Sequence, residues 1–291
     1  MKMLVTGAKG QLGYDVLKEL HRRKIPCRGV DREDCDITSM PQVIQLMEAY
    51  RPDAVIHCAA YTDVNRAESE QALCMDINYR GSANIASAAN KIGAKLIYIS
   101  TDYVFGASGD RPLEIYDDKK PLNVYGETKL SGENSTQILC PRCFIVRTSW
   151  VFGINGANFV KTMLRLGKEQ KELRVVSDQI GSPTYTADLA PLLCDMAMTE
   201  RFGVYHATNE GFCSWYEFAS EIIRMGKRSA KVIPVPSSDY PSAAVRPKNS
   251  RLSKKSLDEA GFPRLPHWRD ALQRYLSELA IAQEEGILKA F

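Results

Sequence analysis

Tyr125 and Lys129 are four positions apart, the spacing that places two side chains on one face of a helix. A tyrosine hydroxyl can give a proton to the alkoxide that hydride attack on a carbonyl creates, but an ordinary phenol, with a pKa of about 10, is a poor partner at neutral pH. A lysine ammonium one turn away favours the phenolate and can hydrogen-bond a nicotinamide ribose. Thr101 supplies a hydroxyl that can hold the carbonyl. We therefore predict that Tyr125, Lys129 and Thr101 catalyse carbonyl reduction.

A glycine-rich turn near the start of the chain predicts where the hydride donor binds. Gly7, Gly10 and Gly13 form the pattern G-x-x-G-x-x-G after the apolar run Lys2–Thr6, and an amphipathic segment follows. Glycines at such a turn let the backbone bend tightly, approach a pyrophosphate and pack a helix against a strand. The helix N-terminus then binds the phosphates. This context predicts a dinucleotide site.

Two adjacent residues leave the choice of cofactor open. Asp31 ends the second apolar run, where an acidic residue hydrogen-bonds an adenosine ribose and favours NAD. Arg32 follows directly, and its guanidinium can pair with the 2′-phosphate of NADP. We therefore expect NADPH or NADH. A metal site of His57, Asp34 and Asp36 is disfavoured by their spacing.

A parallel sheet must position these residues. Up to about Trp150, short apolar runs alternate with longer amphipathic stretches, the pattern of βαβ units. Ligands bind at the carboxyl ends of the strands in such sheets. The predicted strands are Lys2–Thr6, Cys27–Asp31, Ala54–Cys58, Lys95–Ser100 and Cys143–Arg147, and helices are predicted around Leu12–Leu20, from Met40 to about Arg51, over 74–92 and from Tyr125.

After Trp150 the pattern changes to shorter elements. Strands are predicted at Leu173–Val176, Val204–His206 and Val232–Val235, helices near 158–167, 186–199 and 214–225, and a loop or lid at Pro234–Pro247. We predict an α/β fold: a doubly wound parallel sheet (Rossmann fold) over residues 1–150 that binds NAD(P), and a smaller mixed α/β region over 151–291. The second region is expected mainly to bind substrate and to interleave with the first. The pattern does not decide whether 280–291 extend the last helix.

Composition excludes several classes of protein. The 291 residues are 44% hydrophobic and 25% charged, and 38 basic minus 35 acidic residues leave a net charge of +3, so no nucleic-acid partner is expected. The chain lacks a long apolar run and a secretory signal, which predicts a cytoplasmic protein without a membrane partner. The eight cysteines are predicted to be reduced, and Cys140-x-x-Cys143 lacks the companions of a zinc site.

Several longer strings resemble one family. The glycine turn, Tyr125-x-x-x-Lys129 and the chain length resemble the extended short-chain dehydrogenase/reductase family. Within that family, the resemblance is to the dTDP-4-dehydrorhamnose reductases, and it covers about residues 2–279. The strings that carry it are Cys58–Val64, Ser100–Phe105, Leu122–Lys129, Arg147–Val151, Asn158–Met163, Asp178–Thr184 and Arg246–Leu252.

The resemblance implies reduction of the C4 carbonyl of dTDP-4-dehydro-β-L-rhamnose to dTDP-L-rhamnose by NADPH or NADH. It matches Tyr125 to the proton donor, Lys129 to its partner and Thr101, a serine in many relatives, to the assisting hydroxyl. Thr101, Asp102 and Trp150 match sugar contacts, with Asn158 and Arg246 as weaker matches for the nucleotide diphosphate. It matches nine residues to cofactor contacts: Gly10, Gln11, Leu12, Asp31, Asp36, Ile37, Ala60, Tyr61 and Thr62. The predicted cofactor site also includes Gly7, Gly13, Arg32, Ala59, Tyr125 and Lys129.

The resemblance leaves alternatives open. Some relatives are Mg²⁺-dependent dimers, but no metal-binding acids are matched here, so we assign no metal and expect a monomer or homodimer. Another nucleotide sugar is a possible substrate. A non-catalytic NADP-binding regulatory subunit, like that of methionine adenosyltransferase, is a further alternative that the intact Tyr125 and Lys129 disfavour. Trp215, Tyr216 and Phe218 are predicted to pack in a helix core rather than to form a sugar platform, and Trp268 to be a packing anchor.

Overall fold

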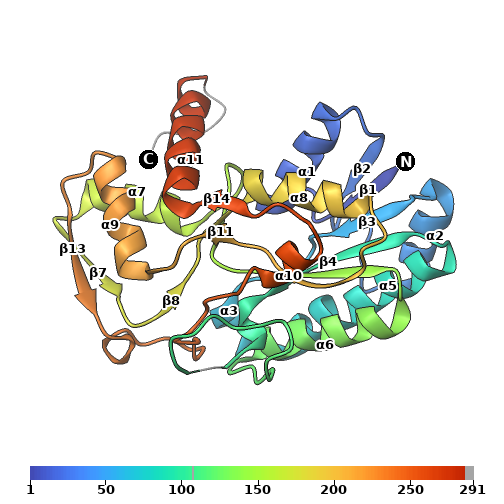
Figure 1. Cartoon of the computed structure of the whole chain (residues 1–291), viewed down its shortest axis with the longest axis horizontal. Coiled ribbons are helices and arrows are strands. Elements are labelled where there is room, and N and C mark those ends of the chain that lie inside the picture. Colours follow the sequence, from blue (N-terminus) through green and yellow to red (C-terminus); the bar gives the residue numbers. More distant parts are fainter. Residues whose placement is uncertain (107, 286–291) are drawn as a thin grey trace.

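Six parallel strands form the central sheet in the computed structural model, which describes residues 1–106 and 108–285. The spatial order is β10-β5-β4-β3-β1-β2, so the order reverses between β1 and β3 (Figure 1). This topology confirms the predicted doubly wound sheet, in which ligands bind outside the carboxyl ends of the strands near the reversal. The strands are β1 (Met3–Thr6), β2 (Cys27–Val30), β3 (Ala54–His57), β4 (Lys95–Thr101), β5 (Cys143–Thr148) and β10 (Gly203–His206).

Helices cover both faces of the sheet because its strands are apolar on both sides. Met3 and Val5 of β1 pack into one core, and Leu4 between them packs into the other. The first core lies under α1 (Gln11–Arg22) and α8 (Thr186–Ala197). The second lies under α2 (Met40–Tyr50), α5 (Ser82–Lys91) and α6 (Val124–Leu139).

Two predicted elements differ in detail from the observed ones. The helix predicted over 74–92 is interrupted, because a π-helical turn η1 (Asp76–Gly81) joins α4 (Gln71–Met75) to α5. The strand predicted at Val204–His206 exists, but as β10 it pairs with β5 and completes the central sheet. The chain therefore leaves the sheet after β5 and returns with α8 and β10. The remaining short elements of the first half are α3 (Val64–Ala67) and the 3-10 turn η2 (Asp102–Val104).

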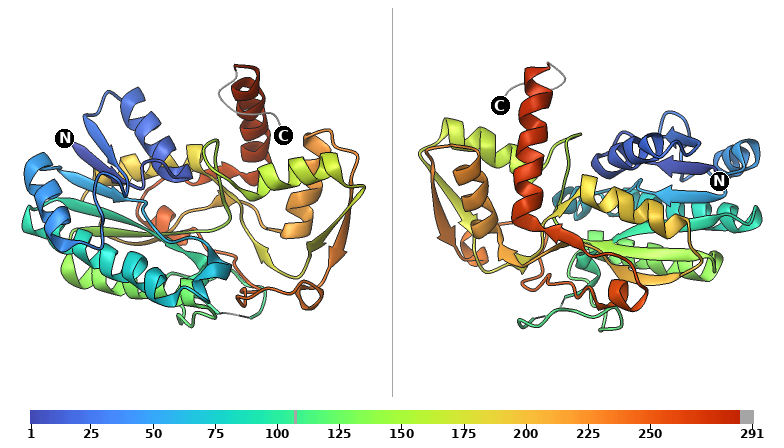
Figure 2. Two further views of the ribbon diagram at one scale, coloured as in Figure 1. Left: turned by 180° about the vertical axis from the view of Figure 1, so that it is seen from behind. Right: turned by 45° about the horizontal axis from the view of Figure 1, so that its top comes forward.

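The other elements form a second unit beside the sheet (Figure 2). Its core contains Phe152, Phe218 and Trp268, and the fully buried Trp268 acts as the predicted packing anchor. Its strands pair two by two: β6 (Val151–Phe152) with β9 (Thr184–Tyr185), β7 (Glu172–Val176) with β13 (Lys231–Val235), β8 (Ile180–Gly181) with β12 (Cys213–Ser214), and β11 (Asn209–Glu210) with β14 (Leu265–His267). Its helices are α7 (Phe159–Glu169), α9 (Trp215–Met225) and α11 (Trp268–Glu284), with a 3-10 turn η3 (Ser237–Asp239). The short helix α10 (Lys255–Glu259) instead packs beside β10, and its Leu257 belongs to the first core of the central sheet.

The predicted loop 234–247 begins within β13 and contains η3. Residues 280–284 belong to α11, and 286–291 lie outside the described residues. All eight cysteines are free thiols, and six of them are buried. No helix in the described ranges is long and apolar enough to cross a bilayer.

Candidate active site

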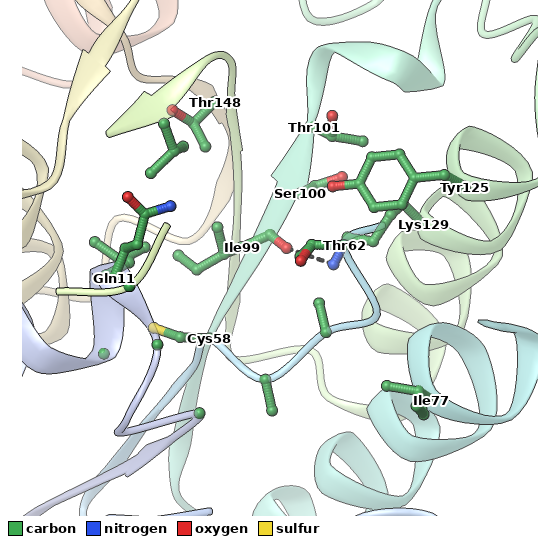
Figure 3. A pocket seen from close by; sticks show the side chains of 18 of the residues that line it. Gln11, Cys58, Thr62, Ile77, Ile99, Ser100, Thr101, Tyr125, Lys129 and Thr148 are labelled. Carbon is green, nitrogen blue, oxygen red and sulfur yellow. Dashed lines mark hydrogen bonds between the residues drawn. The ribbon is translucent and has the colours of Figure 1, made fainter. Parts of the chain in front are cut away.

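A cleft of about 850 Å³ runs from the carboxyl ends of the sheet strands to the second unit (Figure 3). The glycine turn and the ends of β2, β3 and β4 line one side. Residues 149–152, 156–159 and two aromatic side chains of α9 line the other. The cleft is thus the place where the predicted cofactor residues and the predicted sugar residues meet.

The glycine turn leaves no room for side chains. Gly7 has a left-handed φ of +66°, and a Cβ atom there would lie 2.7 Å from the backbone nitrogen of Ala59. A Cβ atom on Gly13 would lie 2.1 Å from the Gly7 carbonyl oxygen. Gly10 is the N-cap of α1 and no side chain caps the helix, so the first N–H groups are free to bind an anion. This backbone cradle fits the pyrophosphate of a dinucleotide.

Asp31 and Arg32 both line the cleft beyond the end of β2. The Asp31 carboxylate accepts hydrogen bonds from the backbone N–H groups of Lys9, at 2.6 Å, and Arg32, at 3.3 Å. Asp36 accepts from the N–H and hydroxyl of Thr38, and these bonds hold its pKa below the usual range. The acceptor for a ribose hydroxyl and the cation for a 2′-phosphate are therefore side by side, as the sequence suggests.

Most of the other predicted cofactor residues also reach the cleft. Gln11, Leu12, Ile37, Ala59, Ala60 and Thr62 line it. Tyr61 does not, because its hydroxyl donates to Glu70 at 2.6 Å, and this bond raises the pKa of Tyr61 to about 12. Only its backbone stays beside the cleft-lining residues.

The start of α6 places the tyrosine and lysine. The Asn123 side chain caps the helix by accepting from the Gly126 N–H at 2.8 Å, so Tyr125 lies in the first turn and Lys129 one turn later. Lys129 is buried, and its ammonium donates to the Ile99 carbonyl at 2.7 Å and lies 4.1 Å from the centre of the Tyr98 ring. Burial lowers the pKa of Lys129 to about 7, and the charge of Glu133 opposes this shift.

Tyr125 is half-buried and faces the end of β4 across the cleft (Figure 3). Burial raises the pKa of its hydroxyl, and a hydrogen bond with Thr101 acts in the opposite direction. The ring of Tyr103 meets it edge-on with centroids 5.7 Å apart. The phenol is therefore protonated at neutral pH and able to donate, with a lysine on the same helix face.

Asp102 is buried next to this group. Its Oδ1 accepts from the Thr101 hydroxyl at 3.1 Å, whereas its Oδ2 has no hydrogen-bond partner in the described part of the chain. Burial raises the pKa of Asp102 to about 6. A hydrogen bond from Ser250 and one from Thr101 oppose this rise. A buried carboxylate oxygen without a partner is unfavourable, and a hydroxyl donor in the cleft would satisfy Oδ2.

Trp150 lines the cleft in a strained conformation. Its φ of +49° is left-handed, which costs a bulky residue about 1–3 kcal/mol unless its surroundings impose it. Its indole stacks on Trp215, with centroids 3.8 Å apart and planes inclined by 14°. The sequence predicts that Trp215 packs in a helix core. It is half-buried there, but it also lines the cleft and was missed as a site residue. Ser214 and Glu217 form a capping box that puts Trp215 at the helix start, and this pattern is visible in the sequence.

Of the two residues predicted to bind the nucleotide diphosphate, only one lines the cleft. Asn158 lines the cleft, but its side chain caps α7 and donates to Gln11 and to the Gly153 carbonyl. Arg246 does not line the cleft. It is half-buried near Tyr103 and donates to Ser242 and to Asn65.

Metal ligands do not gather in the described ranges, where no three His, Cys, Asp or Glu side chains form a potential site. His57 is instead buried between the hydroxyls of Thr6 and Ser82. Burial lowers its pKa to about 3, so the ring is neutral.

A dinucleotide cradle on a doubly wound sheet, facing a Tyr–Lys pair, defines a Rossmann-type NAD(P)-binding oxidoreductase. The family model described as the RmlD substrate binding domain matches residues 1–281, and the chain therefore belongs to the RmlD family of dTDP-4-dehydrorhamnose reductases.

Individual relatives match along nearly the whole chain. A dTDP-4-dehydrorhamnose reductase of Streptomyces griseus is 41% identical, with 93% of this chain and 91% of the relative covered. The spore coat polysaccharide biosynthesis protein SpsK of Bacillus subtilis is 40% identical over 97% and 99%. The crystal structure of a dTDP-4-dehydrorhamnose reductase from Bacillus anthracis in complex with NADP has a TM-score of 0.92 and 45% identity over 96% and 100%.

Proposed function

We propose that this protein reduces the C4 carbonyl of dTDP-4-dehydro-β-L-rhamnose to give dTDP-L-rhamnose, with NADPH or NADH as the reductant. The observation that carries the proposal is the cleft itself, because it joins the glycine cradle to Tyr125, Lys129 and Thr101 in one continuous space. The names of the relatives support the choice of substrate.

The chain's own residues perform defined parts of this reaction. The bound nicotinamide supplies the hydride to the carbonyl carbon. Tyr125 gives its proton to the carbonyl oxygen, so the C=O group becomes CH–OH and the phenolate is left on the protein. Lys129 stabilises that phenolate and is placed to hold the nicotinamide ribose. Thr101 positions the carbonyl oxygen beside the phenol.

The two sides of the cleft bind the two anionic ligands. We assign the cofactor to residues 1–150 and the sugar nucleotide mainly to 151–291, with α8 and β10 returned to the sheet. Asp102 and Trp150 would contact the sugar. We assign Arg246 to the diphosphate because its guanidinium lies next to the cleft-lining Tyr103 and contacts only neutral oxygens of Ser242, Asn65 and Tyr103 in the described part of the chain. The engaged amide of Asn158 supports an indirect role through Gln11.

We further infer that the enzyme works in the cytoplasm as a monomer or homodimer, without a nucleic-acid or membrane partner. The eight free thiols and the net charge of +3 support this inference. Mg²⁺ is left out of the mechanism because no cluster of acidic ligands accompanies the cleft in the described residues.

The test is to mix purified protein, dTDP-4-dehydrorhamnose and reduced cofactor and to follow the loss of nicotinamide absorbance. The expected product is dTDP-rhamnose, identified by mass spectrometry and NMR. The proposal would be refuted by folded protein that binds NADPH but does not oxidise it when dTDP-4-dehydrorhamnose is present. The similarity to SpsK, a protein of spore coat polysaccharide biosynthesis, favours a second candidate, the reduction of another nucleotide sugar. A higher kcat/KM for such a sugar would replace the first candidate.

A further inference from the structure

Trp150 is held from two directions by one small piece of sheet. Strands β8 and β12 pair antiparallel, with Gly181 opposite Cys213. Gly181 lies against the Trp150 indole, so close that a Cβ atom there would be 2.9 Å from two carbons of its ring. Trp215 follows β12 directly and covers one face of the same indole. Gly181 and Trp215 therefore form a clamp around Trp150.

The clamp is itself rigid. The Ser214 hydroxyl accepts from the Glu217 N–H, and the Glu217 carboxylate accepts from the Ser214 N–H. This capping box fixes the helix start that carries Trp215. The Phe159 ring packs on Trp215 with centroids 4.6 Å apart, and Phe218 packs on Phe159. Trp215 thus has few alternative positions, although it lies at the border of the core.

Trp150 needs such support because its backbone is in an unfavourable region. It lies in the turn between β5 of the central sheet and β6 of the second unit, with a left-handed φ. Left-handed residues other than glycine persist only where contacts impose the conformation, and they cluster at ligand sites. Its carbonyl accepts from the Thr184 N–H at 3.2 Å, which holds the backbone, while the clamp holds the indole.

We infer that Trp215 is a positioning residue for the reduction: by stacking on Trp150, it holds that indole in the orientation in which it packs against the apolar face of the substrate's sugar ring. The inference rests on the proposed function. It concerns a residue that, unlike Trp150, needs no contact with the sugar. An indole in a fixed place orients the C4 carbonyl relative to Tyr125, and small displacements at such a site reduce the rate strongly.

The test compares Trp215→Leu, Trp215→Phe and the matched control Tyr216→Phe, which changes the next residue on the helix without lining the cleft. The expected kcat/KM for the sugar nucleotide falls about tenfold or more in Trp215→Leu, while the Kd for NADPH stays unchanged. Trp215→Phe, which keeps a ring, recovers most of the loss. Tyr216→Phe resembles the wild type.

A spectroscopic signature reports the stack independently of activity. The chain has three tryptophans, and the third, Trp268, is buried behind Phe218. Two indoles stacked at 3.8 Å couple excitonically, so the wild type shows a far-ultraviolet circular dichroism couplet that both Trp215 variants lose. Gly181→Ala, which pushes against Trp150 without altering Trp215, is expected to weaken the couplet and to lower kcat/KM as well.

Each outcome has a defined meaning. Loss of the couplet with wild-type kcat/KM in Trp215→Leu overturns the inference, and so does a parallel loss of NADPH affinity, which indicates a structural role only. If Trp215→Leu does not fold, Gly181→Ala decides: a weakened couplet with a lower kcat/KM supports the inference, and a weakened couplet with wild-type kcat/KM overturns it. A wild-type protein that shows the couplet and binds NADPH but does not reduce the substrate refutes the proposed function instead.

Discussion

The two walls of the cleft are built in different ways. The wall to which we assign the cofactor, called here the cofactor wall, is mainly backbone: three glycines and the uncapped start of α1, supported by the four- to seven-residue strands of the sheet. The wall to which we assign the sugar, called here the sugar wall, is mainly side chain: stacked aromatic rings supported by β8 and β12, which have two residues each. A backbone wall binds what every dinucleotide shares, and a side-chain wall is suited to selecting one sugar.

Tyr125→Phe is expected to have the largest effect, because it removes the hydroxyl that we propose donates a proton to the carbonyl oxygen. We predict a fall in kcat of about 10²- to 10⁴-fold. NADPH and dTDP should still bind with wild-type Kd values, measured by fluorescence and calorimetry. Turnover near that of the wild type would remove Tyr125 from the mechanism, and loss of both affinities would indicate a damaged fold.

Gly13→Ala tests the backbone wall. The new Cβ atom would lie 2.1 Å from the Gly7 carbonyl oxygen, so the turn must open. We expect at least about tenfold weaker NADPH binding and a loss of about 1–3 kcal/mol in the free energy of unfolding. Binding of dTDP provides the internal control, because it should be unchanged if the two walls are independent. An equal loss of dTDP affinity would show that they are coupled.

The pH dependence of kcat/KM tests the role of Lys129. Its pKa is lowered to about 7, so its ammonium is present below that pH and is lost as the pH rises through it. If the ammonium is needed, kcat/KM should decline above pH 7, approaching about tenfold per pH unit. Lys129→Arg keeps its charge at every accessible pH and should flatten this decline, whatever its absolute rate. If Lys129→Arg shows the same decline in kcat/KM, the titration of a group other than Lys129 causes the decline.

The smallest effects are expected at Asp31 and Arg32, the two residues whose side chains add to the mainly backbone cofactor wall. Asp31→Ala should weaken NADH roughly tenfold, because the ribose loses its acceptor. Arg32→Ala should weaken NADPH by a similar factor, roughly tenfold, because the 2′-phosphate loses a cation. Kd values for both cofactors with each variant test this pair. If one variant weakens the binding of NADH and NADPH equally, the substituted residue does not discriminate between the two cofactors.

The same contrast explains what could be predicted from the sequence. Gly7, Gly13 and the Tyr125–Lys129 pair were found because fixed spacing within one strand–helix unit determines their geometry. Trp215 was missed because its neighbour Trp150 is 65 positions away, and tertiary contacts, among them the pairing of β8 with β12, bring the two rings together. Helical periodicity indicated a buried aromatic face, and it could not show that the first residue of that face borders a cleft.

The return of the chain to the central sheet also affects how the protein is made. Without α8 and β10, one side of α1 is uncovered and β5 is an open edge. The cofactor half therefore lacks its last strand until residue 206 has left the ribosome, long after the glycine turn has emerged. In a growing chain, the second unit's first elements, β6 to β9, are synthesised before β10, so the central sheet is completed only after part of the second unit has been made.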